Sequence, residues 1–315
     1  MKKFISDILR FSLLIIAVFI GINYILKYNN LDPPHYSLQY DEVVNKIVEA
    51  NAIILGTSHA THSIRPSLLD NSHYKFYNFA LNGSNSTYYL NWYRKYFSIE
   101  YPKPKLCIIS VDWFLFDEKW LWRDFEKDSE YFPSKLFLSL LMGDSKLNKK
   151  ELLLNRFPFF KYRESSNKQN SKFFLEDFDK GFIPFYRPFN LANFTLSQKP
   201  NSIVNLSLVE IANFKKLIQI LLSDKINLIF VMTPEYGLTK EDYKNSESLD
   251  FIYTVSKKYN IPFINFNTTH KNSAISDNVE NFTDWGHMSK IGSIKFSKLL
   301  KKELDKIYKQ KHLWK

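Results

Sequence analysis

Cysteine is almost absent from this chain of 315 residues, because Cys107 is the only one. A single cysteine excludes an intrachain disulfide framework and a zinc site built from several thiolates. Internal repeats, low-complexity tracts and motifs for nucleic-acid binding are also missing, so no repeat architecture and no nucleic-acid partner is indicated. With 45% apolar and 17% aromatic residues the chain nevertheless has ample material for a packed core. Cys107 lies in the apolar run KLCIIS, where core packing is its expected role.

Acidic residues are fewer than basic ones, 32 against 43, and the net charge of +11 is concentrated at the C-terminus. The last 28 residues contain nine lysines against Glu303 and Asp305, a local excess of +7. Apolar residues recur there at helical spacing, which predicts an amphipathic helix with a lysine-rich outer face. That face is either simply solvated or in contact with an anionic lipid or polymer.

An uncharged apolar run extends over residues 11–26 near the N-terminus. A membrane-spanning helix needs about 20 mostly apolar residues, with about 17 as the lower limit. No small-residue cleavage site follows, which favours an uncleaved membrane anchor at 1–30 over a cleaved signal peptide or a buried core helix. Three basic residues precede the run and only Lys27 follows it directly. We therefore expect a single-pass membrane protein with a cytoplasmic N-terminus, whose remainder is exported to the periplasmic or extracellular side.

Residues 31–50 carry paired prolines among polar residues, as a linker from membrane to domain would. Beyond them, short apolar runs rich in Ile, Val and Phe alternate with helical patterns. The predicted strands are 51–56, 74–81, 105–111, 226–232 and 261–266, and the predicted helices are 86–97, 206–222, 248–259 and the C-terminal segment. This alternation indicates an α/β fold of three layers, in which right-handed βαβ units form a doubly wound, mostly parallel sheet.

Residues 113–200 interrupt this alternation between the third and fourth predicted strands. They contain 21 of the 53 aromatic residues of the chain. Such a segment is too aromatic for a loose loop, so we expect an insertion that packs against the edge of the sheet. It either covers the site or has a simple structural role. The catalytic domain would then comprise residues 51–112 and 201–315.

The first predicted strand ends in Gly-Thr-Ser-His, residues 56–59. Ligands of doubly wound sheets bind outside the C-terminal ends of the strands, and Ser58 lies at that edge. A serine hydroxyl becomes a nucleophile when an adjacent base takes its proton and a third group orients the base. Asp284 and His287 form Asp-x-x-His just before the last helix, a spacing that in a turn lets the carboxylate reach one imidazole nitrogen. The residues thus predict a triad of Ser58, His287 and Asp284.

These sequences resemble the signature blocks of the SGNH, or GDSL-type, hydrolase superfamily. The serine of that family lies in a Gly-Asp-Ser-like block after the first strand, which GTSH resembles with Thr57 in place of the usual acid. The second block provides a glycine whose N–H joins the oxyanion hole, and NFALNGSN offers Gly83. The last block is Asp-x-x-His, which corresponds to Asp284 and His287.

The third block of the family, typically Gly-x-Asn, corresponds here to SVDW. Asp112 stands in the position of the asparagine, and a carboxyl group donates no hydrogen bond unless it is protonated. The third oxyanion donor is therefore missing or comes from another residue. His59 and Asn82, the neighbours of Ser58 and Gly83, are expected to line the site together with Asp112.

The resemblance implies acyl transfer on an SGNH-like, flavodoxin-like fold. His287 would take the proton of Ser58 and Asp284 would hold the imidazole. The N–H groups of Ser58 and Gly83 would stabilise the tetrahedral oxyanion, where one donor is typically worth about 3 to 4 kcal/mol. The family mechanism implies no cofactor and no metal.

Within the superfamily, the chain resembles exported, membrane-anchored proteins that act in O-acylation of cell-surface polymers. These include proteins similar to the D-alanyl transfer protein of teichoic acid systems and to alginate acetylation proteins. The resemblance implies a cell-surface polysaccharide or acyl donor, with acetyl as the expected acyl group, and a multispanning membrane O-acyltransferase as partner. Whether water or a sugar hydroxyl accepts the acyl group stays open.

Two other interpretations stay open. His59 and His62 form His-x-x-His, which on a helix would share one face and could hold a metal ion together with Asp284 or His287. Alternatively, the exported domain keeps the fold without catalysis and serves as a scaffold that binds a polysaccharide or a membrane partner. The substitution at Asp112 and the aromatic insertion favour this second alternative.

Overall fold

The computed structural model describes residues 2–29, 49–95, 97, 102–117, 137–138, 141–142, 148–161, 178–185, 189, 200–202 and 205–311. Two compact units make up the chain. The anchor unit comprises Met1–Tyr40 and Asp124–Phe173, and the sheet unit comprises Asp41–Arg123 and Phe174–Lys315. The segment predicted as an insertion, 113–200, is thus divided: its two ends belong to the sheet unit and its middle to the anchor unit. Nearly all of the predicted linker, and much of that segment, lies outside the described residues.

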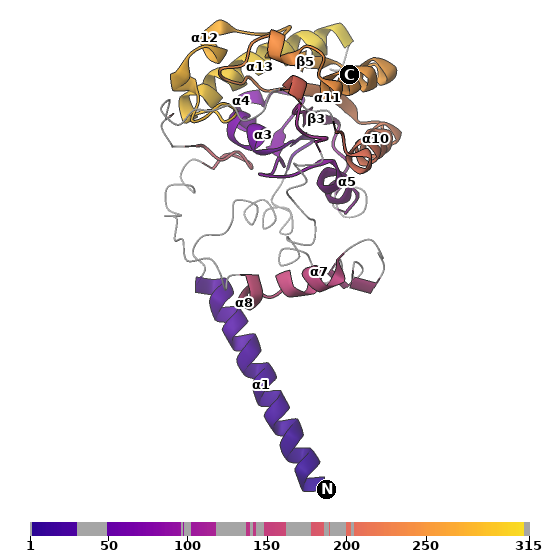
Figure 1. Ribbon diagram of the computed structural model, residues 1–315, viewed down its shortest axis with the longest axis vertical. Helices are drawn as coiled ribbons and strands as arrows, with labels where there is room; N and C mark the ends of the chain where they lie inside the picture. Colours follow the sequence, from indigo (N-terminus) through magenta and orange to yellow (C-terminus); the bar gives the residue numbers. More distant parts are fainter. Residues whose placement is uncertain are drawn as a thin grey trace. The chain divides into compact units, whose positions relative to one another are not determined.

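Five parallel strands form the centre of the sheet unit (Figure 1). They are β1 (Ala52–Leu55), β2 (Phe76–Asn78), β3 (Leu106–Ser110), β4 (Asn227–Met232) and β5 (Phe263–Asn265). Each strand lies inside one of the predicted apolar runs, and their order in the sheet is β2-β1-β3-β4-β5. In register, Ile54 lies opposite Ile108, which in turn lies opposite Ile229. The prediction of an α/β fold with a parallel sheet is confirmed.

Helices of the sheet unit pack in two groups, which correspond to the two faces of the sheet. The first group consists of α3 (Ser58–Ser63), α4 (Pro66–Leu69), α12 (Ser273–Ser276) and α13 (Lys290–Lys311). The second group consists of α5 (Ser86–Lys95), α10 (Leu208–Ser223) and α11 (Glu247–Tyr259). Three short 3-10 turns, η6 (Pro200–Ser202), η7 (Glu241–Tyr243) and η8 (Val279–Asn281), complete the described elements of this unit.

Successive side chains of a strand point to opposite faces of the sheet, and this alternation shows which face each helix group covers. Ile108 and Ile229 belong to a buried cluster that includes Phe296 of α13. The next residue of β4, Phe230, points to the opposite face and packs against Phe214 of α10 with ring centroids 5.7 Å apart. Both faces of the strands are therefore buried, which is why the strand sequences are apolar throughout rather than alternating.

The helices that the sequence predicts are present, and local sequence explains where they begin and end. Ser207 and Ser246 cap the N-termini of α10 and α11 by accepting hydrogen bonds from the N–H groups of Glu210 and Leu249. Asn260 ends α11 in the left-handed conformation, with φ 53°. The predicted C-terminal helix is α13, which ends at Lys311.

The strand order reverses direction at β1, and this reversal positions the site. From β1 the chain proceeds outward to β2 and then returns to β3 on the other side of β1. Connections leaving β1 and β3 therefore diverge at the C-terminal ends of these strands and leave a crevice, which is where doubly wound sheets bind their ligands. Residues that follow β1 and β3 directly, Gly56–Ser58 and Val111–Trp113, lie at this edge.

The described helices of the anchor unit are α1 (Lys2–Asn29), α7 (Lys149–Asn155) and α8 (Pro158–Lys161). Within α1, the 23-residue stretch Lys3–Ile25 is long and apolar enough to cross a membrane, and most of its apolar side chains are exposed. A signal sequence near an N-terminus has the same length and composition. An apolar N-terminal helix is thus present, while its orientation in a membrane stays a prediction.

Candidate active site

Ser58 is the first residue of α3 and directly follows the turn after β1. Thr57 caps the helix, because its Oγ1 accepts a hydrogen bond from the N–H of His59 (3.3 Å). Gly56 makes the turn possible: a Cβ there would lie 2.6 Å from the Cβ of Ala60 and 2.8 Å from that of Ser110. A side chain at Gly56 would force α3 away from β3, and Ser58 with it.

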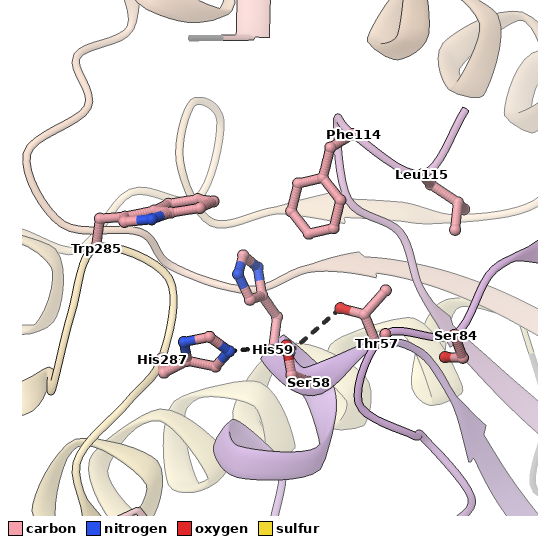
Figure 2. A pocket seen from close by; sticks show the side chains of 9 residues that line it. Thr57, Ser58, His59, Ser84, Phe114, Leu115, Trp285 and His287 are labelled. Atoms are coloured by element: carbon pink, nitrogen blue, oxygen red, sulfur yellow. Dashed lines mark hydrogen bonds between the residues drawn. The ribbon is translucent and has the colours of Figure 1, made fainter. Parts of the chain in front are cut away.

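His287 lies beside Ser58, with its Nε2 2.7 Å from the serine Oγ (Figure 2). It comes from the loop between α12 and α13, at the other end of the sequence. The N–H of Thr283 donates to the carbonyl of His287 (2.9 Å), and Phe282 pairs with Met288 in an antiparallel bridge. These bonds close residues 283–287 into a tight turn that holds the imidazole in place.

Asp284 orients the imidazole from within the same turn. The Nδ1 atom of His287 lies 2.7 Å from Oδ2 and 2.9 Å from Oδ1 of Asp284. Oδ1 also accepts hydrogen bonds from the N–H groups of Gly286 (2.9 Å) and His287 (2.8 Å). Burial by itself would raise the pKa of Asp284, but its bonds to the imidazole and to the two N–H groups lower that pKa to about 2. An ionised Asp284 holds the proton on Nδ1, which leaves the Nε2 lone pair for the serine hydroxyl.

The loop after β2 brings Gly83 to the same edge. The N–H of Leu81 and the Oγ of Ser84 both donate to the carbonyl of Gly56 (2.9 Å each), which fastens this loop to the end of β1. Gly83 has a φ of 68°, a conformation that favours glycine. Within the described part of the chain, the N–H groups of Ser58 and Gly83 have no hydrogen-bond acceptor. Both residues line the cavity described below.

Asp112 lies at the end of β3 but faces the interior instead of the cavity. One carboxyl oxygen accepts a hydrogen bond from the Oγ1 of Thr57 (2.5 Å), and the other lies 3.1 Å from Nδ1 of His59. Asp112 is fully buried. The side chain therefore takes no part in lining the site, contrary to the prediction, because both of its oxygens are held by residues that flank Ser58.

Glu235, which follows β4, is a second buried acid beside His59. Its Oε1 lies 3.6 Å from Nδ1 of His59 and accepts a hydrogen bond from Nε1 of Trp113 (3.0 Å). Its Oε2 accepts a hydrogen bond from the hydroxyl of Tyr243. Burial raises the pKa of Glu235 to about 7, although the charge of His59 and the bond from Tyr243 act in the opposite direction. In the sequence, the only feature that could have singled out Glu235 is its position just past the end of the fourth predicted strand.

His59 is the central residue of this buried group. It also borders the turn of residues 283–287 that carries His287, which is called the catalytic turn below. Burial would lower the pKa of the His59 imidazole, but the charge and hydrogen bond of Asp112, with a smaller contribution from Glu235, raise it. The ring is in edge contact with Trp285 and His287, both at 5.2 Å between centroids. The imidazole of His59 thus lies between the two acids and the loop that carries His287.

The residues around Ser58 enclose a cavity of about 160 Å³. Trp285 and Phe114 lie above His59 and His287 and form the apolar side of this cavity (Figure 2). The complete lining consists of Thr57, Ser58, His59, Gly83, Ser84, Phe114, Leu115, Trp285 and His287. The predicted lining residue His59 is among them, whereas Asn82 and Asp112 are not. A cavity of this volume has room for a short acyl group and is smaller than the roughly 300–1,000 Å³ of pockets for drug-sized ligands.

Residues from the predicted insertion reach the site. Phe114 and Leu115 line the cavity, and the ring of Phe185 stacks on that of His287 with centroids 5.4 Å apart. Next to it, Nδ1 of His62 lies 2.7 Å from the carbonyl oxygen of Ile183. The sequence singled out the segment as aromatic, but no spacing rule could show which of its 21 aromatic residues would contact the imidazole.

The His-x-x-His pair of α3 is divided between two surroundings. His59 turns its Nδ1 to Asp112, and His62 turns its Nδ1 to the backbone of Ile183. Among the residues that the structure describes, no group of three or more His, Cys, Asp or Glu side chains could hold a metal ion. The His-x-x-His motif is thus explained by contacts within the protein.

Comparison with known proteins adds a likeness of fold. No protein-family model and no curated protein sequence matches the chain. Similar solved structures include a GDSL-like lipase from Bacteroides thetaiotaomicron, at 11% identity and a TM-score of 0.38, covering 87% of this chain and 98% of that one. Another is the lipase/acylhydrolase from Enterococcus faecalis, at 13% identity and a TM-score of 0.38, covering 80% and 94%. At such scores the comparison carries no argument about function, which has to come from the residues of the site.

Proposed function

We propose that this protein transfers acyl groups from esters through Ser58, as an exported, membrane-anchored serine esterase or O-acyltransferase. The observation that carries the proposal is the continuous chain of short contacts from Ser58 Oγ to His287 Nε2 (2.7 Å) and from His287 Nδ1 to Asp284 (2.7 Å). This chain borders an open cavity and joins residues that lie more than two hundred positions apart. Nucleophile, base and orienting acid thus meet the geometric requirement of a triad.

In the proposed reaction Ser58 Oγ forms a bond to the acyl carbon while its proton passes to Nε2 of His287. The N–H groups of Ser58 and Gly83 stabilise the negative charge that develops on the acyl oxygen. The bond to the leaving alcohol then breaks, and the alcohol oxygen takes the proton from His287. A second hydroxyl, from water or from a sugar, attacks the acyl-serine by the reverse sequence and restores Ser58.

The acyl group that best fits the site is a short one such as acetyl. Phe114, Leu115 and Trp285 restrict the cavity to about 160 Å³. The apolar helix at the N-terminus supports an exported location, and an exported domain would meet cell-surface polysaccharide and other acyl donors. We extend the proposal to O-acylation or deacylation of such a polymer beside a multispanning membrane O-acyltransferase, on the resemblance of the sequence motifs.

The proposal is tested by labelling the full-length protein in detergent with a fluorophosphonate, which reacts with activated serines. We expect the wild type to be labelled, and Ser58→Ala and His287→Ala to lose labelling. Ser223→Ala is the matched control, because this serine at the end of α10 is exposed and donates only to a backbone carbonyl. Turnover of p-nitrophenyl acetate in the same samples reports hydrolysis.

The outcomes separate the alternatives. Labelling that persists in Ser58→Ala would refute Ser58 as the nucleophile. Absence of labelling in a folded wild type would favour the non-catalytic scaffold. Labelling without turnover would assign the protein to the transferases, which need an acceptor other than water.

A further inference from the structure

In the anchor unit, one end of α1 is joined to α8 by specific contacts. The ring of Phe19 packs against three aromatic rings, of Phe157 at 5.4 Å and of Phe159 and Phe160 at 5.9 Å between centroids. Asn23, one turn further along α1, accepts a hydrogen bond from the backbone N–H of Phe159 (2.9 Å). The start of α8 is thereby held at a fixed position along α1.

Asn23 explains why this junction is suited to a membrane boundary. An amide side chain in an apolar helix needs partners for its polar atoms, since lipid offers none. The Nδ2 of Asn23 donates to the carbonyl of Phe19 (2.8 Å), and its Oδ1 is taken by Phe159, so both ends of the amide are satisfied. Asn23 is 8% exposed, whereas its neighbours Ile22, Tyr24 and Ile25 on α1 are 39–70% exposed.

The depth of the junction follows from helix geometry. The apolar stretch of α1 ends at Ile25. At a rise of about 1.5 Å per residue, Asn23 lies about 3 Å and Phe19 about 9 Å before that end. Helices that lie in the plane of a membrane bury their apolar face about 5–10 Å into the boundary between headgroups and acyl chains. The contact with Phe19 lies within this range, and the contact with Asn23 lies slightly nearer the headgroups.

The composition of α7 and α8 fits the same boundary. Leu153, Phe159 and Phe160 are 39–43% exposed, so the described protein leaves these three apolar side chains partly uncovered, whereas Leu152 is buried. In sequence, residues 148–161 contain four basic residues, at positions 149, 150, 156 and 161, against Glu151. Aromatic and leucine side chains together with Lys and Arg are typical of segments that lie in the headgroup region.

We infer that α7 and α8 form an in-plane anchor that lies in the interface of the bilayer crossed by α1, on the side where α1 ends. The partner of this surface is the lipid bilayer itself: Leu153, Phe159 and Phe160 enter the acyl boundary, and the exposed Lys149 and Lys150 meet the headgroups. The inference rests on the membrane placement of α1, which is part of the proposed function. It gives the middle of the aromatic insertion a role in attaching the protein to the membrane.

The test measures depth at single positions of the full-length protein in lipid nanodiscs. Cysteine is introduced at Ile15, Phe160, Leu153 or Lys257 and labelled with an environment-sensitive fluorophore. The native Cys107 is buried, and any label that it takes up is a background signal. This background is measured on the unsubstituted protein. Lipids with a spin label near the carbonyl or near the chain end, and iodide in the buffer, quench the fluorophore according to its depth.

We expect the label at Ile15 to be quenched by the deep spin label and that at Lys257, on α11, by iodide. The labels at Phe160 and Leu153 should be quenched by the shallow spin label, at least about threefold more than the label at Lys257, as an in-plane segment requires. Asn23→Leu, which removes the acceptor for Phe159, should reduce shallow quenching at Phe160. Gly21→Ala is its control, because no heavy atom lies within 4 Å of the added Cβ.

Each outcome decides the inference. If Ile15 is in lipid and Phe160 is quenched by iodide alone, the in-plane anchor is wrong while the spanning helix stands. If Phe160 is shielded from both lipid and iodide, a protein covers the surface and the lipid assignment is overturned. If Ile15 itself is not reached by lipid quenchers, the membrane placement fails and this inference with it, whereas the labelling of Ser58 is unaffected.

Discussion

Replacing Gly286 with alanine tests whether His59 sets the position of the catalytic turn. Gly286 lies between Trp285 and His287 and faces the ring of His59. A Cβ at this position would lie 2.1 Å from Nε2 and 2.5 Å from Cε1 of that ring, whereas ordinary contacts begin at about 3.4 Å. One of the two, the ring or the turn, has to move by about 1.3 Å.

The ring is the less movable partner. His59 is 2% exposed, its Nδ1 is held by Asp112 at 3.1 Å, and Phe114 is in edge contact with the ring at 5.1 Å. The turn of residues 284–287 lies nearer the surface, since the side chain of Asp284 is 43% exposed. The methyl group should therefore displace the turn, and with it the contact of 2.7 Å between His287 and Ser58.

A misplacement of about 1 Å can reduce an enzymatic rate by about 10²-fold, or about 2.7 kcal/mol in activation free energy. We expect Gly286→Ala to lower the rate of fluorophosphonate labelling by about that factor. Overpacking should also cost about 1–3 kcal/mol in unfolding free energy, which leaves a folded protein. Urea unfolding of the same samples separates the loss of rate from a loss of folded protein.

Gly21→Ala is the matched control, as it makes the same chemical change where the added Cβ meets no heavy atom within 4 Å. It should label at the wild-type rate. If Gly286→Ala labels within about twofold of the wild type, the turn is not fixed by His59, because a shift of 1 Å should be visible. A loss of rate fully matched by a loss of folded protein would also refute the reasoning.

Three further predictions concern packing and pH. Gly56→Ala should destabilise the protein by about 1–3 kcal/mol in urea unfolding, because the Cβ would lie within 2.8 Å of Ala60 and Ser110; stability equal to that of Gly21→Ala would contradict the close packing. The lowered pKa of Asp284, about 2, contributes stability that is present above the unfolded pKa and is lost as the pH falls from about 4 to 2. Asp284→Asn should make the unfolding free energy less dependent on pH in this range. The same variant should reduce labelling by up to about 10⁴-fold. The raised pKa of Glu235, about 7, means that the native state holds a proton that the unfolded state has lost, so stability should fall as the pH rises from about 4.5 to 7. Glu235→Gln should reduce this decline, while Glu241→Gln, at an exposed glutamate, should not; equal slopes in both variants would contradict the assignment.

The strands were predictable because both faces of a parallel sheet are buried. Runs such as NAIILG and INLIFVM stand out against polar surroundings, and β1 and β4 lie inside them. The contact among Ser58, His287 and Asp284 was predictable for a related reason: Ser58 follows a strand, and Asp284 lies three residues before His287, so spacing alone limits what they can reach. The order of the strands in the sheet could not be predicted, because an apolar run does not show which strand lies beside it.

The buried group around His59 was not predictable from spacing. Asp112 and Glu235 are separated by more than a hundred residues and reach His59 only because β3 and β4 are adjacent in the sheet. By analogy with an asparagine of the similar motif, Asp112 was expected to line the site, and the structure instead buries it with both oxygens in contact with Thr57 and His59. The division of residues 113–200 between two units was also hidden, because aromatic residues suit either a protein core or a membrane boundary.

Thr57 and Asp112, the two residues that differ from the GDSL-type motif that the sequence resembles, are joined by a single hydrogen bond. The hydroxyl of Thr57 donates to the carboxyl of Asp112 (2.5 Å), so the pair links the segments that follow β1 and β3, next to Ser58 in the chain. The other oxygen of Asp112 is then free to hold His59, and His59 in turn borders Gly286 and His287. Asp112 is thus connected to the catalytic turn through one ring. In this structure the residue at position 112 therefore contacts Thr57 and His59 inside the protein, and it acts on the turn of His287 only through the His59 ring.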